Sequence, residues 1–267
     1  MQEFDSAEII KTIVLPKTIN ETSGLEFYNK NFITHNDSGD GPSLYVFNEN
    51  GDLIKTIDLN KDANFEIENN DWEDIASDDK YLYVADTGNN FGNRSNLNII
   101  RVNKEEDYKV DGIIEILYAD QETFFPRPKH KYDAEAILVI DEQLVLFSKD
   151  RENLNTDLYL VDKFEKATQK LTSEFDFNVN SLITGGDYKN ELHLLALVSY
   201  NSKGNQYLIL FERFDLENLE ENTFKKYKIP LERAQIESIK IIDKNTFWVT
   251  SEDEGIGNPF MYKLKVK

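Results

Sequence analysis

Short runs of alternating hydrophobic and polar residues fill most of the chain, and turn residues separate them. Such runs lie at 9–15, 43–47, 97–102, 144–147, 207–211 and 260–266. A period of two predicts β-strands, and no segment keeps a helical period over three turns. The segment 48–52, which contains Asn-Gly, predicts a tight hairpin between two of these strands. We therefore expect an all-β protein.

One pattern recurs five times along the chain, with a polar residue at the same place each time. The five segments are Ser23-Gly-Leu25, Glu73-Asp-Ile75, Glu135-Ala-Ile137, Ser181-Leu-Ile183 and Glu237-Ser-Ile239. Their polar residues are 50, 62, 46 and 56 positions apart, and joining the two termini would place Ser23 53 positions after Glu237. A period near 50 residues indicates a repeat architecture that closes on itself.

The first four repeats can each be divided into four strands, whereas the last has only three, at 239–242, 247–250 and 260–266. In the third repeat the fourth strand is the weak segment 168–173. The N-terminal run 9–15 would supply the missing outer strand of the last repeat, which would remove exposed sheet edges. We predict a single domain, residues 1–267, that is a five-bladed β-propeller of four-stranded antiparallel blades, the last closed by the N-terminal strand.

The repeated polar residues lie at the start of each first strand, and the first strand of a propeller blade lines the central channel. We therefore expect five side chains to converge there as metal ligands: Ser23, Glu73, Glu135, Ser181 and Glu237. Three carboxylates in one channel do not all stay ionised without a cation. Calcium takes six to eight oxygen ligands in loose geometry, whereas zinc prefers the His and Cys that this ring lacks. In the alternative interpretation, these residues cap strand ends and hold water.

A second polar layer follows the second strand of the repeats. Asp37, Asp86, Lys149 and Ser251 come 13 or 14 residues after the corresponding ring residues. A hairpin of that length returns to the level of the ring, so both layers would open on one face. The candidate catalytic residues are Asp37 and Asp86, with His35 as a further candidate base, and the candidate substrate-binding residues are Arg94, Lys149, Arg151 and Glu252. The alternative is that Asp, Asn and Gly here are simply turn formers.

Composition narrows the possible partners. The chain has 50 acidic and 30 basic residues and a net charge of −20, which argues against a nucleic-acid partner. The acidity fits a field that concentrates divalent cations, although solubility alone would also explain it. No apolar run is long enough to span a bilayer, and the absence of cysteine excludes disulfides and thiolate sites. The N-terminus shows no signal peptide, and a chain from which such a peptide had been removed would look the same. We expect a periplasmic or cell-surface location with the signal removed.

The ring pattern resembles the calcium-activated nucleotidase (apyrase) family of five-bladed propellers, in which each blade presents one Ser or Glu to a calcium ion. The order Ser-Glu-Glu-Ser-Glu fits that pattern, and the segments 32–47 and 247–254 are similar to acidic segments of the family. One departure is Asp37-Ser38-Gly39, where the family carries an Arg after its Asp pair. The segments 71–76 and 82–90 also resemble bacterial NHL and gluconolactonase-like propellers, which usually have six blades.

Three functions remain open at this point. The first is a calcium-dependent hydrolase of phosphoanhydrides or phosphate esters, in which calcium polarises the phosphoryl group and Asp37 or Asp86 orients water. The second is a lactonase-like esterase that uses the same cation. The third is a non-enzymatic binding propeller with a structural calcium, since propellers host all of these functions. The expected partner is a small anionic molecule or another protein.

Overall fold

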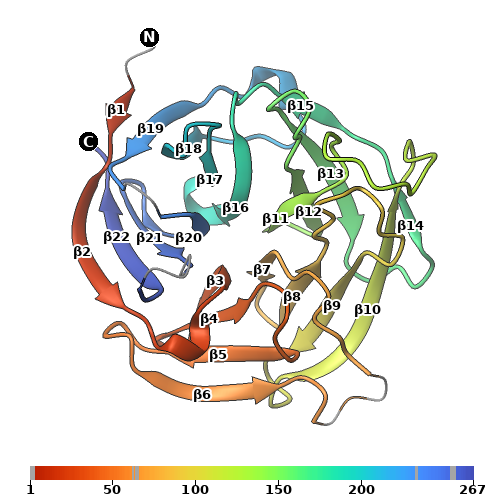
Figure 1. Cartoon of the computed structure of the whole chain (residues 1–267), viewed down its shortest axis with the longest axis horizontal. Helices are drawn as coiled ribbons and strands as arrows, with labels where there is room; N and C mark the ends of the chain where they lie inside the picture. The colour runs from red at the N-terminus through yellow and green to blue at the C-terminus, as the bar shows by residue number, and fades with distance from the viewer. Residues whose placement is uncertain (1–3, 62, 64–65, 232–233, 253–256) are drawn as a thin grey trace.

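The computed structural model describes residues 4–61, 63, 66–231, 234–252 and 257–267, and within them 22 strands form five sheets around a central axis (Figure 1). The end of the acidic segment 247–254 therefore lies outside the described residues. This arrangement confirms the predicted five-bladed propeller. The described residues contain three short 3₁₀ helices, η1 (Lys17–Ile19), η2 (Asn190–Leu192) and η3 (Leu219–Glu221), and no helix that is long and apolar enough to cross a membrane.

In each blade the strands follow one another outward from the axis. The inner strands are β3 (Thr22–Tyr28), β7 (Asp74–Ser77), β11 (Ala134–Ile140), β16 (Leu182–Lys189) and β20 (Ile236–Asp243). The second strands are β4 (Asn31–Asn36), β8 (Tyr81–Asp86), β12 (Gln143–Ser148), β17 (Leu194–Tyr200) and β21 (Thr246–Ser251). The third strands are β5 (Ser43–Phe47), β9 (Asn98–Asn103), β13 (Thr156–Asp162), β18 (Gln206–Glu212) and β22 (Phe260–Lys265). The outer strands are β6 (Leu53–Asp58), β10 (Lys109–Tyr118), β15 (Phe175–Phe177), β19 (Lys225–Ile229) and β2 (Glu8–Val14).

The N-terminal strand closes the propeller as predicted. Strand β2 pairs antiparallel with β22, with Val14 opposite Phe260. The inner strands contact one another in turn, and β20 contacts β3 to complete the circle. A strand from the N-terminal part of the chain and the last strand, β22, are thus held in the same sheet (Figure 1).

The predicted outer edge needs correction in the third blade, and the second and fourth blades each gain a further strand. The segment expected to close the third blade forms β14 (Gln169–Leu171), which pairs in parallel with β10 of the second blade instead. The outer strand of the third blade is β15, which pairs with β13. A further short strand, β1 (Asp5–Ser6), pairs in parallel with β19 of the fourth blade. The second and fourth blades therefore have five strands, because a neighbouring segment covers each outer edge.

The hydrophobic core consists of clusters that lie between adjacent blades. In β12, Leu144 and Leu146 face the cluster shared with the second blade, whereas Val145 and Phe147 face the cluster shared with the fourth. Successive residues of a strand point to opposite faces, so burial on both faces makes such a strand hydrophobic throughout. Near the axis, the buried carboxylate of Asp74 accepts hydrogen bonds from the backbone N–H groups of Ile137 at 3.0 Å and Gly186 at 3.2 Å. Asp74 thereby ties three inner strands together.

A β-bulge with one unpaired residue lies near the start of three of the inner strands. The unpaired residue is Glu135 in β11, Thr184 in β16 and Glu237 in β20. A bulge of this kind re-aims the side chain that it carries. Ser181 lies three residues before the bulge of its blade, so it is not structurally equivalent to Glu135 and Glu237, with which the sequence pattern aligns it. Thr184 occupies the position of the glutamates there, and its hydroxyl donates to the carbonyl of Ile236 at 2.6 Å.

Candidate metal centre at the channel mouth

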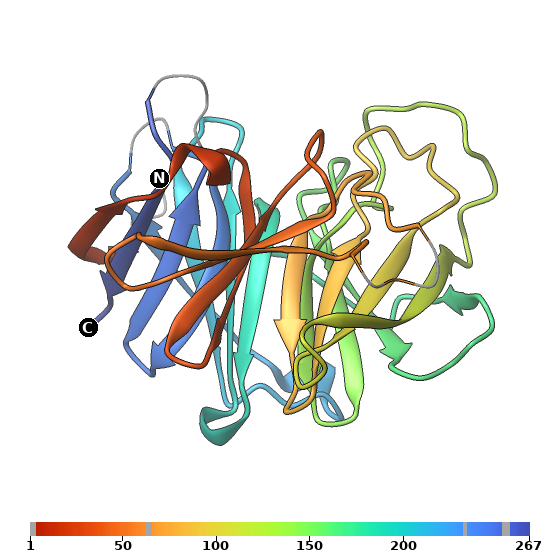
Figure 2. The ribbon, with the colours of Figure 1, turned by 90° about the horizontal axis from the view of Figure 1, so that it is seen from below.

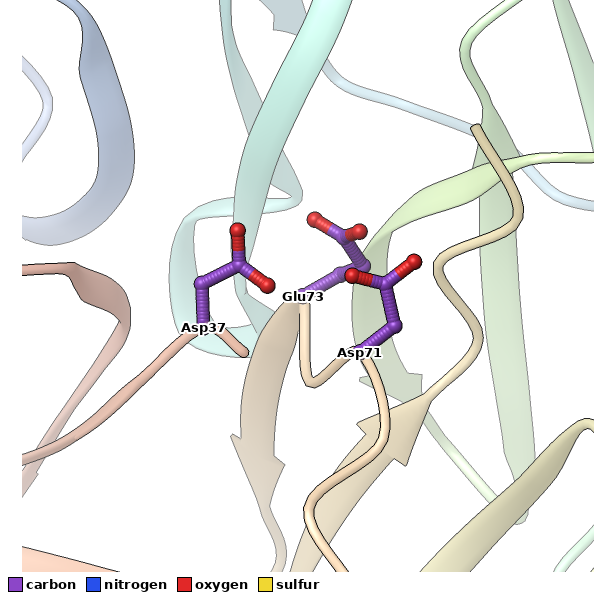
Figure 3. A group of neighbouring side chains, drawn as sticks. All are labelled: Asp37, Asp71 and Glu73. Carbon is purple, nitrogen blue, oxygen red and sulfur yellow. The ribbon is translucent and has the colours of Figure 1, made fainter. Parts of the chain in front are cut away.

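Five carboxylates gather at the end of the channel where the inner strands begin. Two groups of three share Glu73: Asp37, Asp71 and Glu73 form one, and Glu73, Asp133 and Glu135 form the other. Within each group, the selected carboxylate oxygens lie within 4.8 Å of one another. Figure 3 shows the carboxylates of the first group turned toward a common space. We call these five residues the mouth cluster.

Local hydrogen bonds hold the first group in place. Asp37 follows β4, and its backbone N–H donates to the carbonyl of Glu21 at 2.9 Å. The N–H of Glu73 donates to the carbonyl of Ala85 at 2.9 Å, and the N–H of Gly88 donates to the carbonyl of Asp71 at 3.1 Å. The side chains are therefore presented by the starts of inner strands and by the ends of second strands, which meet at one face of the propeller (Figure 2).

Gly88 packs directly against two of these carboxylates. A Cβ atom at this position would lie 2.1 Å from Oε1 of Glu73 and 2.5 Å from Oδ2 of Asp71. No side chain fits at such distances without displacing a carboxylate. The glycine therefore lets the 87–90 loop approach the cluster.

Two basic side chains neutralise only one side of the mouth cluster. Lys149 Nζ lies 2.9 Å from Oε1 of Glu135, and Arg151 lies 2.7 Å from Oδ2 of Asp133 and 3.5 Å from Glu135. Lys149 and Arg151 follow β12, so the hairpin of the third blade brings them back to the level of Glu135. Among the described residues, no ion pair involves Asp37, Asp71 or Glu73. The ion pairs of the mouth cluster thus lie on the third blade, whereas on the second blade burial raises the pKa of Asp71 and the charge of Arg94 opposes this rise without forming an ion pair with it in the described part of the chain.

The missing counter-charge shows in the pKa values. Burial, followed by the charge of Asp71, raises the pKa of Asp37 to about 8. Burial also raises the pKa of Glu73 well above its ordinary range, and Glu135 adds to this effect. The pKa of Glu135 rises only to about 7, because Lys149 partly offsets the burial. Without a cation, these carboxyl groups compete for protons at neutral pH.

The side chains of the first group suit a hard cation. Oδ1 of Asp37 is buried and has no hydrogen-bond partner among the described residues. Oδ1 of Asn69 is also buried without a hydrogen-bond partner among the described residues. Its Nδ2 donates to the carbonyl of Asn36, next to Asp37, at 3.0 Å. Carboxylate and amide oxygens are the ligands that calcium takes in proteins. The chain has no cysteine, so a thiolate site is excluded.

The five predicted ring residues have different surroundings. Glu73 and Glu135 belong to the mouth cluster. Burial raises the pKa of Glu237 well above its ordinary range, with Lys149 opposing and Glu135 adding to the rise. The hydroxyl of Ser23 donates to the backbone carbonyl of Glu73. The hydroxyl of Ser181 lies 3.0 Å from that of Ser199 and accepts from Lys226 at 2.8 Å, so it is engaged within its own blade.

The residues of the second predicted polar layer also have different surroundings. Asp37 and Lys149 stand at the mouth cluster, whereas Asp86 is 1% exposed and forms an ion pair with Arg94 at 2.8 Å. Asp86 also accepts from Asn70 at 3.0 Å, from Asn98 at 3.3 Å and from the backbone N–H of Asp71 at 3.1 Å. Asp86 is thus saturated and positions the loop that carries Asp71. Arg94 in turn donates to the carbonyl of Gly88 at 2.6 Å.

Two other predicted residues lie near the cluster without contributing a base. The charge of Glu252 raises the pKa of both Asp37 and Glu237, so it adds to the negative potential of the mouth. His35 is fully buried, its Nδ1 lies 3.0 Å from the carbonyl of Asn36, and burial lowers its pKa to about 4. The ring is therefore neutral at pH 7 and is enclosed beside Trp72.

Sequence reasoning missed Asp71 and Asp133, although a signal for them exists. The second and third blades both begin with an Asp-x-Glu pattern, Asp71-Trp-Glu73 and Asp133-Ala-Glu135. The fifth blade has Gln235 in the corresponding place. Reading the repeat two residues further upstream would therefore have found both aspartates.

Comparisons with known proteins show the fold and no closer relationship. No family model and no curated protein matches the sequence. Among solved structures, a GH43 β-1,3-galactosidase determined with galactodeoxynojirimycin matches with a TM-score of 0.55 and 11% identity over 97% of this chain and 94% of that one. A hypothetical protein from Leishmania major matches with a TM-score of 0.52 and 8% identity, over 97% of this chain and 91% of that one. A chain of the mitotic checkpoint complex matches with a TM-score of 0.50 and 10% identity, over 100% of this chain and 94% of that one.

At such low identities the three likenesses establish the propeller fold alone. The resemblance to calcium-activated nucleotidases and to gluconolactonase-like propellers continues to rest on the sequence motifs.

Proposed function

We propose that this protein is a cation-binding propeller whose channel mouth holds one divalent ion, with calcium as the best fit, and presents it to an anionic ligand. The observation that carries the proposal is the pair of carboxylate triads that share Glu73. Asp37, Asp71 and Glu73 would be the principal ligands. Asp133 and Glu135 would complete the site from the third blade. Ser181 is left out, because its hydroxyl is engaged by Ser199 and Lys226.

The charge distribution supports a ligand above the cation. The first group has no ion pair among the described residues, so a divalent ion would relieve its repulsion. Lys149 and Arg151 stand on the other side and are held by Glu135 and Asp133. An anion on the cation would also be near these two positive charges. A phosphoryl or carboxylate group matches that arrangement.

A second candidate function is hydrolysis at the same carboxylates, and the raised pKa of Asp37 favours it. A carboxyl group with a pKa near 8 is protonated at neutral pH and can act as a general acid. With the cation bound, Asp37 would instead be ionised and could orient a water molecule. One of the fold neighbours is a β-1,3-galactosidase, so glycosides belong among the substrates to be tried.

One set of measurements separates these functions. The melting temperature is recorded with calcium, with magnesium and with chelator, because a ligand bound only by the folded state raises stability by RT ln(1 + [L]/Kd). Turnover of nucleotides, sugar phosphates, lactones and aryl glycosides is then tested under the same conditions. We expect calcium to raise the melting temperature. Calcium-dependent turnover would add the hydrolase function, and turnover only with chelator would favour metal-free acid–base chemistry. No calcium shift at millimolar concentration would refute the cation site.

A further inference from the structure

A groove at the fourth blade differs in charge from the rest of this acidic molecule. It has a volume of about 870 Å³, and its described lining contains three lysines, five asparagines, three aromatic residues and no carboxylate. The lysines are Lys203, Lys226 and Lys228. The whole chain has 50 acidic residues against 30 basic ones, so a surface with only positive charge is unexpected. We call this surface the lysine groove.

Lys226 is the most enclosed of the three lysines. Its Nζ donates to the carbonyl of Val179 at 2.7 Å and to the hydroxyl of Ser181 at 2.8 Å, and it lies 4.4 Å from the ring centroid of Tyr207 and 5.8 Å from that of Phe4. These partners are all neutral. They fix the position of the ammonium group without cancelling its charge.

The neighbouring residue shows what an ordinary surface lysine does in the same strand. Lys225 points to the other face of β19 and forms an ion pair with Glu212 at 2.8 Å. Lys226 forms no ion pair with any described residue, and burial alone lowers its pKa to about 8. Partial burial of a cation is costly when no anion compensates its charge. The geometry thus leaves a place for an external anion.

We propose that the lysine groove binds a hydroxylated carboxylate of sugar size, such as a uronic acid or a short acidic saccharide. The carboxylate would be attracted by Lys226, Lys203 and Lys228. The asparagine amides can both donate to and accept from hydroxyl groups, and the aromatic side chains offer apolar faces to the carbon skeleton of a sugar. The volume falls in the range of small-molecule sites. This site uses none of the mouth-cluster residues and is independent of the proposed cation.

The test is calorimetric titration of the whole protein with glucuronate, glucose and inorganic phosphate, at low ionic strength and with chelator present so that the mouth cluster carries no metal. We expect glucuronate to bind at least tenfold more tightly than glucose, because only glucuronate carries the charge. Lys226→Met should weaken glucuronate binding at least tenfold. Lys225→Met, the matched control on the other face of the strand, should leave it unchanged.

A second variant guards against a folding defect, since Lys226 also holds Val179 and Ser181 in place. Lys203 and Lys228 are exposed, so the double change Lys203→Ala, Lys228→Ala should leave the melting temperature unchanged and still weaken glucuronate binding. Equal affinity for glucose and glucuronate would overturn the proposal, as would the absence of glucuronate binding at about 10 mM. Binding of phosphate without binding of glucuronate would reduce the groove to a simple anion site and would also contradict it.

Discussion

The two ends of the channel both hold buried acidic residues, but a lysine compensates the negative charge at one end and no lysine among the described residues bridges the first group of carboxylates at the other. At the far end, Lys240 Nζ lies 2.9 Å from Glu26 and 2.8 Å from Asp187, so one lysine bridges carboxylates of two inner strands. The backbone N–H of Ile241 also donates to Asp187 at 2.7 Å. We call these residues the Lys240 bridge. At the mouth, Asp37, Asp71 and Glu73 approach one another with no such partner among the described residues.

This difference in charge compensation indicates a structural role for the Lys240 bridge and a binding role for the mouth cluster. The Lys240 bridge is complete as it stands, so it can hold inner strands together without any external component. In the mouth cluster the carboxylates repel one another unless a proton or a cation is bound. Buried charges that a protein leaves uncompensated are candidates for a binding or catalytic role. The predictions below test whether the two ends respond in these opposite ways.

The largest expected effect is at the Lys240 bridge. Lys240→Met should lower the free energy of unfolding by about 3 kcal/mol, because removing one partner leaves two enclosed carboxylates without their counter-charge. Urea unfolding at pH 7 measures this change. Calcium affinity should stay the same, since the bridge lies away from the mouth. A stable variant would mean that the bridge contributes little.

The next effect concerns the close approach of the 87–90 loop. Gly88→Ala should weaken calcium binding by at least about tenfold, or roughly 1.4 kcal/mol, because the new Cβ would displace Glu73 or Asp71. Gly41→Ala is the matched control, since its Cβ would meet only Ser43 Oγ at 3.9 Å. Calorimetry on both variants decides the matter, and equal affinities would argue against this geometry.

A smaller effect of opposite sign to the Lys240 variant is expected at Glu73. With chelator present, Glu73→Gln should raise the free energy of unfolding by about 1 kcal/mol at pH 8, since the folded state then no longer has to bury this carboxylate or to protonate it above its ordinary pKa. Thermal unfolding with and without chelator measures this effect. A loss of stability in chelator would show that Glu73 is compensated in the metal-free protein, contrary to the account.

The last prediction is a pH dependence of the metal-free protein. The folded state raises the pKa of Asp37 from 3.8 to about 8 and that of Glu135 from 4.5 to about 7, so it binds more protons than the unfolded chain in this range. Stability with chelator should therefore fall as the pH rises from about 4 to 8. Melting temperatures at pH 5 and pH 8 test this sign. Saturating calcium should reduce the fall, because the cation replaces the protons.

Much of the fold could be predicted from the sequence, because the repeats combine β-strand alternation with a regular period. The N-terminal strand was found from the three-stranded last repeat. The pairing of β14 with the second blade could not be predicted in the same way. A strand pattern indicates that a segment is extended, but the sheet edge it joins depends on the chain segments between the blades.

The candidate site was only partly predictable for a related reason. Aligning Ile183 with the Leu or Ile that ends the repeated segment elsewhere shifts the fourth repeat by three residues, because the strand pairing places its bulge at Thr184. The aspartates Asp71 and Asp133 were overlooked because they lie just outside the repeated segment. The unequal distribution of charge also depends on Lys149 and Arg151, whose side-chain directions follow from tertiary packing. A symmetric ring was therefore expected where the structure has a one-sided cluster.

The most direct test of the cation site is a calorimetric titration of calcium into the wild-type protein and into Glu73→Gln at pH 8. The account predicts one calcium ion per wild-type chain and at least about a hundredfold weaker binding in the variant, because both triads lose their shared ligand. Equal binding by the two proteins, or no binding by the wild type at millimolar calcium, would contradict the claim that the mouth cluster is a metal centre.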